Sequence, residues 1–227
     1  MNKLKVMLCA VFTLVLVNTT AQADSSNFAG QYVGLTISGY GLQMDGEANT
    51  ASGGTTETDN VSLGQVAPVT GIELGYALPL GGAFLIDVGL AYYSGEAKMD
   101  YVSDDGPADD GLGGKAVSFA IDELVSYYIA PTLVLSDTSS LYVKIGLTEA
   151  DIGVTGDITT PGNLSGKTWA MGTRTVLPSG IFIRTEAGYT DYNGISSHGK
   201  GSSIAATNTY SAEPTIAFGA VSLGFRF

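Results

Sequence analysis

The sequence predicts an all-β fold, an eight-stranded antiparallel up-and-down transmembrane β-barrel. Apolar and polar residues alternate with a period of two in eight separate segments, a pattern typical of strands that have one apolar and one polar face. The connections between these segments alternate between long and short, as they do when strands run up and down a barrel. Beyond residue 23, no segment has a long apolar stripe at helical spacing. Only a closed sheet can pair all its backbone groups inside a membrane, so a barrel is the expected architecture.

The first 23 residues predict a signal peptide that is cleaved off, which leaves residues 24–227 as the barrel domain. Two lysines precede an apolar run from Val6 to Val17, and Ala21-Gln22-Ala23 forms a small-residue cleavage site. The run is too short to cross a bilayer as a helix. The one cysteine, Cys9, lies within this segment, so we expect a mature chain without disulfides or thiol chemistry.

The composition fits one exported domain and argues against a nucleic-acid partner. The chain has 10 Lys and Arg against 22 Asp and Glu, a formal net charge of −12. Contacts to phosphates require clustered basic side chains, which this sequence lacks. Its 31 glycines accompany many aromatic and β-branched residues, so the composition is not that of a disordered chain.

The alternation also predicts where strands and connections lie. The eight expected strands are Gln31–Gln43, Ser62–Leu78, Phe84–Tyr93, Ala116–Leu135, Leu141–Thr148, Trp169–Leu177, Ile181–Thr190 and Glu213–Phe227. Long polar loops are expected at Met44–Val61, Lys98–Lys115, Val154–Ser165 and Gly194–Ala212. The short turns between them would face the periplasm and the long loops the cell exterior. Glu123 breaks the parity of its strand, which indicates either a strand end above the membrane or a β-bulge.

Eight charged residues are expected to face the lumen, four acids and four bases. Charges in a narrow interior are costly unless they are paired, so we predict a salt-bridged network that fills and stiffens the barrel. A gate is the functional alternative, with Arg184 and Glu186 as candidates because they share one face. The predicted network residues are Glu73, Asp87, Asp122, Lys144, Arg174, Arg184, Glu186 and Arg226.

The remaining polar and aromatic residues are expected to be non-catalytic. The 12 tyrosines fall mostly toward strand ends, as in the aromatic girdles of membrane proteins. His198, the only histidine, lies in an expected loop without a partner for acid–base catalysis, so we expect no enzyme activity and no cofactor. The first two long loops are acidic but lack the spacing of a calcium loop, so we expect a solvated acidic cap and no metal site. Their acids are Asp45, Glu47, Glu57, Asp59, Asp100, Asp104, Asp105, Asp109 and Asp110.

Two stretches resemble known bacterial outer membrane barrels. The terminal AVSLGFRF, Ala220–Phe227, resembles the carboxy-terminal signal that the barrel assembly machinery recognises, which implies Val221, Leu223, Phe225 and Phe227 as an assembly signal. FIRTEAGYTDYNG, Phe182–Gly194, is similar to the penultimate strand of small porin-family barrels related to the transmembrane domain of outer membrane protein A.

The sequence and this resemblance together predict a monomeric protein in the outer membrane of a Gram-negative cell envelope. We expect a structural or surface-interaction role, exerted through four extracellular loops over a largely plugged lumen. The alternative is a narrow porin or ion channel for small solutes. The expected partners are outer membrane lipids, the barrel assembly machinery during biogenesis and an extracellular partner that the sequence does not identify.

Overall fold

The computed structural model describes residues 24–52, 55–102, 116–201 and 204–227. The predicted signal peptide and the acidic residues Asp104, Asp105, Asp109 and Asp110 lie outside the described residues. No helix among the described residues is long and apolar enough to cross a membrane.

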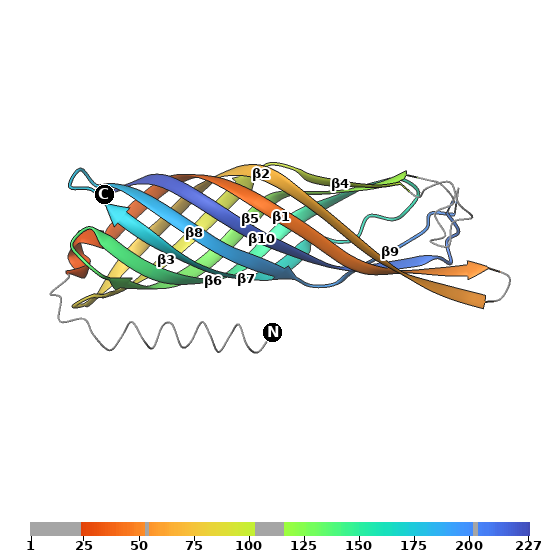
Figure 1. The fold of residues 1–227 in the computed structure, drawn as a ribbon, viewed down its shortest axis with the longest axis horizontal. Helices are drawn as coiled ribbons and strands as arrows, with labels where there is room; N and C mark the ends of the chain where they lie inside the picture. Colours follow the sequence, from red (N-terminus) through yellow and green to blue (C-terminus); the bar gives the residue numbers. More distant parts are fainter. Residues whose placement is uncertain (1–23, 53–54, 103–115, 202–203) are drawn as a thin grey trace.

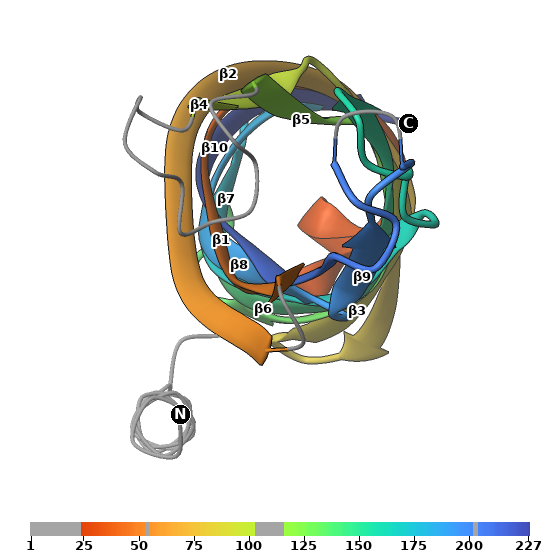
Figure 2. The ribbon, with the colours of Figure 1, turned by 90° about the vertical axis from the view of Figure 1, so that its right-hand side faces the viewer.

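Within the described residues, eight strands form a closed antiparallel ring, which confirms the predicted fold class (Figures 1 and 2). The pairing of the first and last strands closes the ring and runs from Tyr32 opposite Arg226 to Asn49 opposite Thr209. The ring contains, in order, β1 (Gly30–Ser52), β2 (Thr55–Gly81), β3 (Phe84–Ser94), β5 (Ala116–Val134), β6 (Ser139–Thr155), β7 (Leu164–Val176), β8 (Ile181–Tyr192) and β10 (Thr209–Arg226). Two short strands extend it, β4 (Ala97–Val102) beside β5 and β9 (Ile195–His198) beside β10.

Outside a bulge in β5, the two faces of the strands follow the predicted parity. On β2, Ile72 and Leu74 are about half exposed on the outside, whereas Glu73 between them is buried. On β10, Val221 and Leu223 are exposed and Ser222 between them is buried. Apolar side chains thus cover the outside of the ring, as a barrel surrounded by lipid requires.

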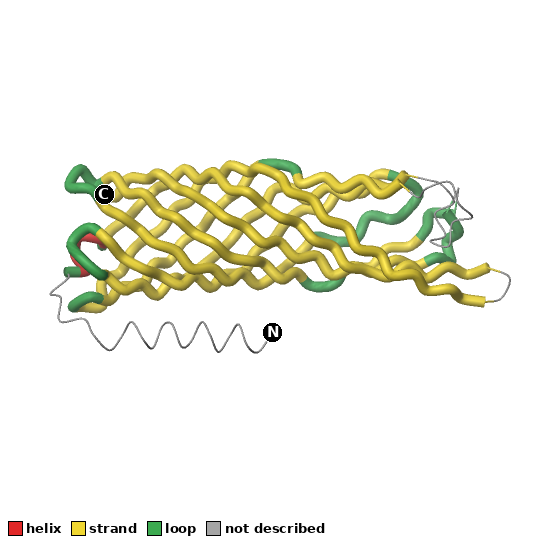
Figure 3. The backbone as a smooth tube through the Cα atoms, in the orientation of Figure 1, coloured by secondary structure: helices red, strands yellow, loops and turns green. Residues whose placement is uncertain are grey.

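The strands are longer than the sequence predicted at one end, and the predicted long loops are correspondingly shorter. β1 and β2 stay paired through all the described residues of Met44–Val61, and this hairpin projects beyond the rest of the ring (Figure 3). The prediction of a loop was wrong here because strands that leave the membrane carry polar residues on their outer face. The inner face nevertheless keeps the period of two, with Met44 and Ala48 buried.

The same error affects two other predicted loops. Lys98–Lys115 begins inside β4, and Gly194–Ala212 contains β9 together with the start of β10. We call this extended side of the barrel the loop end, and the side with the short connections 82–83, 135–138 and 177–180 the turn end.

Glu123 marks a β-bulge, one of the two alternatives that the sequence left open. Its φ of 49° lies in the left-handed region, and the β5–β6 register shifts between Asp122 and Val125. The extra residue explains why the parity of β5 changes there.

A single-turn 3₁₀ helix, η1 (Ser25–Phe28), closes the turn end (Figure 2, red-orange helix inside the ring). Phe28 is fully buried against the interior, and the Ser25 amide donates a hydrogen bond to the Gly82 carbonyl at 3.1 Å. Asp24 caps the helix by accepting a hydrogen bond from the Ser26 amide, which lowers the pKa of the Asp24 carboxyl.

The interior is packed in layers. Phe28, Leu85 and Phe182 belong to a small apolar cluster at the turn end. A larger apolar cluster that includes Leu42, Ile152 and Ile216 occupies the loop half. Buried polar and charged side chains lie between the two.

Several tyrosines lie inside the barrel, so the expected girdle is only partly correct. Tyr76, Tyr92 and Tyr127 are exposed on the outer surface and suit a girdle. Within the described residues, six others are buried in the interior, namely Tyr32, Tyr40, Tyr93, Tyr128, Tyr142 and Tyr192.

Most of these inner rings lie over a glycine on the neighbouring strand. Tyr32 is paired with Gly75, and a Cβ added to Gly75 would overlap the ring. The same relation holds for five further pairs, Tyr93 with Gly71, Tyr128 with Gly89, Tyr142 with Gly172, Phe182 with Gly224 and Tyr192 with Gly166. In so narrow a ring a large side chain fits only where its neighbour has none, so the inward glycines and the inner rings require each other.

Candidate functional site

A cluster of six charged side chains fills the middle of the barrel. It contains three acids and three bases, and each side chain is less than a tenth exposed. The cluster consists of Glu73 on β2, Asp87 on β3, Lys144 on β6, Arg174 on β7, and Arg184 and Glu186 on β8. We call these six residues the lumen charge cluster.

The first ion pair joins β8 to β2. Arg184 donates from Nη1 to Glu73 Oε2 at 2.7 Å. The Tyr128 hydroxyl lies 3.4 Å from both groups and 2.9 Å from the Tyr32 hydroxyl. The pair is therefore embedded in hydroxyl groups that compensate for part of the lost hydration.

The second ion pair joins β7 to β3. Arg174 donates from Nη2 to Asp87 Oδ2, which also accepts a hydrogen bond from the Thr132 hydroxyl at 3.2 Å. Arg184 Nη2 lies 4.0 Å from the same oxygen, so this pair and the first form one connected group.

The third ion pair joins β6 to β8. Lys144 Nζ lies 2.6 Å from Glu186 Oε2 and donates to Oε1 at 2.7 Å. The Tyr142 hydroxyl donates to Oε2 of the same carboxylate at 2.8 Å. Lys144 Nζ also lies 4.4 Å from the centre of the Tyr128 ring, a cation–π contact.

Aromatic rings pack against the two guanidinium groups. Arg174 and Arg184 each lie 5.1 Å from the centre of the Tyr32 ring, and Arg184 lies 5.2 Å from that of Tyr142. Phe182 packs edge-on against Tyr32, with 5.8 Å between ring centres. Rings and ion pairs together occupy the cross-section of the lumen.

The strand order explains why the charges pair across the lumen. Arg174 and Arg184 are direct neighbours in the β7–β8 register, where two like charges repel each other. Their acids come from β2 and β3, which lie on the other side of the ring. Each of these ion pairs therefore connects opposite walls of the barrel rather than neighbouring strands.

Two residues of the predicted network lie apart from this cluster. Asp122 is half-buried at the bulge of β5 toward the loop end, because the bulge reverses the parity of the strand and places Val117 and Ile121 on the inner face instead. Arg226 is half-buried at the turn end, where the last residue of β10 reaches only the Ala29 carbonyl, at 2.9 Å.

Sequence reasoning missed the aromatic and hydroxyl partners of the cluster. Tyr32, Tyr128 and Tyr142 were assigned to a girdle although their parity places them on the inner face. A usable signal was present, because each of them lies in a strand that neighbours one with inward glycines. His198 is exposed on β9, and among the described residues no group of three or more His, Cys, Asp or Glu is arranged to hold a metal ion.

Replacing Arg184 with alanine tests the cluster. We expect Arg184→Ala to lower the free energy of unfolding by about 3–5 kcal/mol, because Glu73 would remain buried and charged without its partner. Urea unfolding of the refolded barrel in lipid vesicles would measure this loss. Neutralising the acid as well, in Arg184→Ala/Glu73→Gln, should restore part of the stability.

Lys167→Ala serves as the control for that measurement. Lys167 is exposed on the outer face of β7, so its removal should change the free energy of unfolding by about 0.5 kcal/mol or less. An Arg184→Ala barrel that unfolds at the same urea concentration as the wild type would contradict a structural role for the cluster.

Comparison with solved structures finds several outer membrane proteins with similar folds. OprG from Pseudomonas aeruginosa is 12% identical, with a TM-score of 0.46, and the match covers 88% of this chain and 97% of that one. The outer membrane protease OmpT from Escherichia coli is 9% identical, with a TM-score of 0.46 and coverage of 92% and 100%. Ail, the attachment invasion locus protein of Yersinia pestis, is 12% identical, with a TM-score of 0.39 and coverage of 87% and 99% in its complex with the heparin analogue sucrose octasulfate. A search of curated proteins finds none that matches.

The family comparison covers almost the whole chain. The model of the outer membrane protein beta-barrel domain matches residues 10–225. This match agrees with the closed ring of eight strands and its apolar outer surface. The chain belongs to the outer membrane protein β-barrel family and resides in the cell outer membrane.

Proposed function

We propose that this protein is a non-enzymatic, monomeric surface barrel whose lumen is closed and whose loop end makes contacts outside the cell. The observation that carries the proposal is the lumen charge cluster, whose two arginine ion pairs connect opposite walls and whose third pair joins β6 to β8. A solute would have to break these pairs to pass, and breaking a buried pair is costly. The cluster therefore acts as a structural plug.

The loop end supports the second half of the proposal. The β1–β2 hairpin extends past the ring and places Asp45 and Glu47 on its exposed outer face. Asp45 lies opposite Glu213 in the β1–β10 register, so like charges stand side by side at this end. A projecting acidic surface favours cationic partners and repels the phosphates of lipids.

Conductance in a planar lipid bilayer tests whether the lumen is closed. We expect the refolded wild type to be electrically silent, because buried ion pairs and aromatic rings lie in the path that an ion would have to take. Combined removal of Arg174 and Arg184 side chains, in Arg174→Ala/Arg184→Ala, should produce single-channel steps if the variant folds. Reproducible steps from the wild type would instead favour the narrow channel. If Arg184→Ala then changed the conductance of these steps, the cluster would be a selectivity device.

Shortening the β1–β2 hairpin tests the role of the loop end. The variant lacks residues 46–61 and has a two-residue Asn-Gly turn in their place. We expect phosphatidylcholine nanodiscs that contain the wild-type barrel to bind a poly-L-lysine surface in a salt-sensitive way, and the variant to lose this binding. Surface plasmon resonance would measure the binding. A second variant keeps the full-length hairpin and neutralises three acids, with Asp45→Asn, Glu47→Gln and Glu213→Gln. It should also bind the poly-L-lysine surface weakly. Unchanged binding by both variants would exclude this surface.

We also propose the end of β10 as the signal for the barrel assembly machinery. Four apolar side chains here face outward with exposed fractions from 41% to 72%, namely Val221, Leu223, Phe225 and Phe227. The rings of Phe225 and Phe227 contact each other, with 5.2 Å between ring centres. An outward apolar row at the last strand is accessible to an assembly partner before the barrel enters the membrane.

Phe227→Ala separates assembly from stability. We expect it to lower the amount of folded barrel in cell outer membranes severalfold, while the refolded protein keeps its urea midpoint, because Phe227 is the most exposed of these side chains and packs little. Phe84→Ala, on an outward phenylalanine that is 43% exposed on β3, is the control and should assemble normally. Equal assembly of the two variants would contradict the signal.

A further inference from the structure

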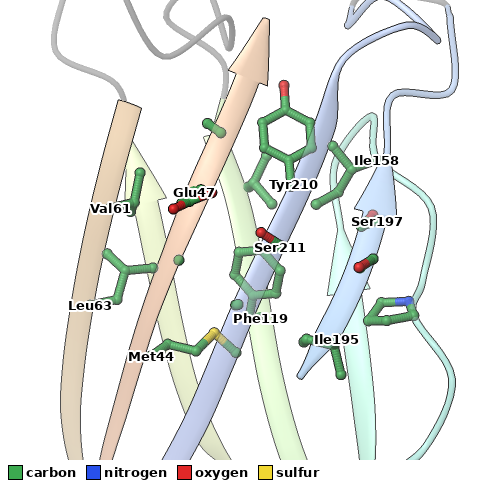
Figure 4. Close-up of a pocket in the computed structure, with 16 residues that line it drawn as sticks. Met44, Glu47, Val61, Leu63, Phe119, Ile158, Ile195, Ser197, Tyr210 and Ser211 are labelled. Atoms are coloured by element: carbon green, nitrogen blue, oxygen red, sulfur yellow. The ribbon is translucent and has the colours of Figure 1, made fainter. Parts of the chain in front are cut away.

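A half-open apolar pocket lies in the loop end of the barrel, beyond the lumen charge cluster (Figure 4). It has a cavity volume of about 80 Å³. Residues of four ring strands (β1, β2, β5 and β10), of β9 and of one connection line it, among them Met44 and Ala48 on β1, Phe119 on β5, Ile158 and Ile195. Its lining is almost entirely apolar.

The lining is ordered rather than a loose surface patch. Met44, Ala48 and Ile158 are at most 3% exposed, and Ile158 packs with Val117 and Ile204 in a separate buried cluster. The Ile158 segment is also tied to β9, where the Ser197 hydroxyl donates to the Thr159 carbonyl and the Thr159 amide donates to the His198 carbonyl. A concave apolar surface that is held in shape and lies outside the lipid belt is the usual form of a small-molecule site.

Buried apolar side chains separate the pocket from the turn end. Leu42, Leu124 and Ile216 lie below it as part of the larger apolar cluster. The lumen charge cluster follows beneath them. A ligand must therefore enter and leave through the loop end, so the pocket is suited to binding and not to passage.

The surrounding charges restrict which ligand fits. Glu47 belongs to the pocket wall with its side chain exposed on the outer face of β1, and Asp45 and Glu213 are exposed nearby on β1 and β10. Lys200, a base at this end, donates to the Gly156 carbonyl at 3.2 Å. With a net charge of −12 on the chain, the potential at the mouth disfavours anions.

From size, lining and charge we infer that this pocket binds the compact apolar end of a small neutral or cationic organic molecule and discriminates against anions. The volume is about half that of an apolar cavity of roughly 150 Å³ that binds benzene. The enclosed space therefore takes a short alkyl group or one edge of a ring, while the rest of the molecule remains in the open mouth. This inference goes beyond the proposed surface role, and it holds whether or not the lumen conducts.

A series of three fluorinated ligands with the same ring tests both the pocket and its charge preference. 4-Fluorotoluene is neutral, 4-fluorobenzylamine is cationic at neutral pH and 4-fluorobenzoate is anionic. Fluorine NMR titrations against the full chain in phosphatidylcholine nanodiscs, with empty nanodiscs subtracted, would give each affinity. We expect saturable binding of the first two and about tenfold weaker binding of the benzoate at low salt, a gap that shrinks in about 1 M salt.

Three variants locate the binding. Ala48→Phe and Val61→Phe fill the pocket from β1 and β2, and each should weaken binding of 4-fluorobenzylamine by about tenfold or more. Ala217→Phe adds the same volume to the exposed outer face of β10 and should bind like the wild type. Val61 is only half-buried, so its variant should fold even where Ala48→Phe does not.

Two results would overturn the inference. The first is ligand binding by nanodiscs with the wild-type barrel that never saturates or that equals the binding by empty nanodiscs. The second is wild-type affinity in a filling variant whose circular dichroism shows a folded barrel. Equal affinity for the benzoate and the benzylamine would overturn the charge preference. Because none of these readouts involves conductance or the poly-L-lysine surface, their outcome is distinguishable from that of the proposed function.

Discussion

The structure depends on the closure of the sheet by the β1–β10 pairing. In hydrocarbon an unpaired backbone amide or carbonyl costs several kcal/mol, so a spanning sheet must pair its first strand with its last. Here that pairing joins residues 32–49 to residues 209–226. A ring of eight strands then leaves an interior just wide enough for side chains, and the pairing of inner aromatic rings with glycines follows from that width.

The narrow interior also determines how charges are accommodated. A lone charge such as Asp87, which is fully buried, would be prohibitive, whereas three acids matched to three bases and surrounded by hydroxyls are tolerated. The cluster also resists slippage of the strands. A shift of one residue would turn Arg174 and Arg184 toward lipid, so the ion pairs help to specify the register.

The two ends of the barrel meet different solvents and are built differently. At the turn end, η1 and Phe28 close the interior with a small apolar cluster. At the loop end, the strands continue into water with polar outer faces but keep apolar inner faces, which line the pocket. The protein thus combines a sealed middle with an outer mouth that offers a concave apolar surface.

The sequence by itself determined the all-β class, the eight ring strands and most of their inward and outward faces. Six of the eight charges that it places in the lumen lie in the lumen charge cluster. These features depend on a period of two, which is local and readable along the chain. Only the tertiary structure decided the partners, because Arg184 and Glu73 meet across a closed ring. It also decided the lengths of the hairpins, the inward role of Tyr32, Tyr128 and Tyr142, and the pocket. Each of these depends on contacts between distant strands, which no local pattern records.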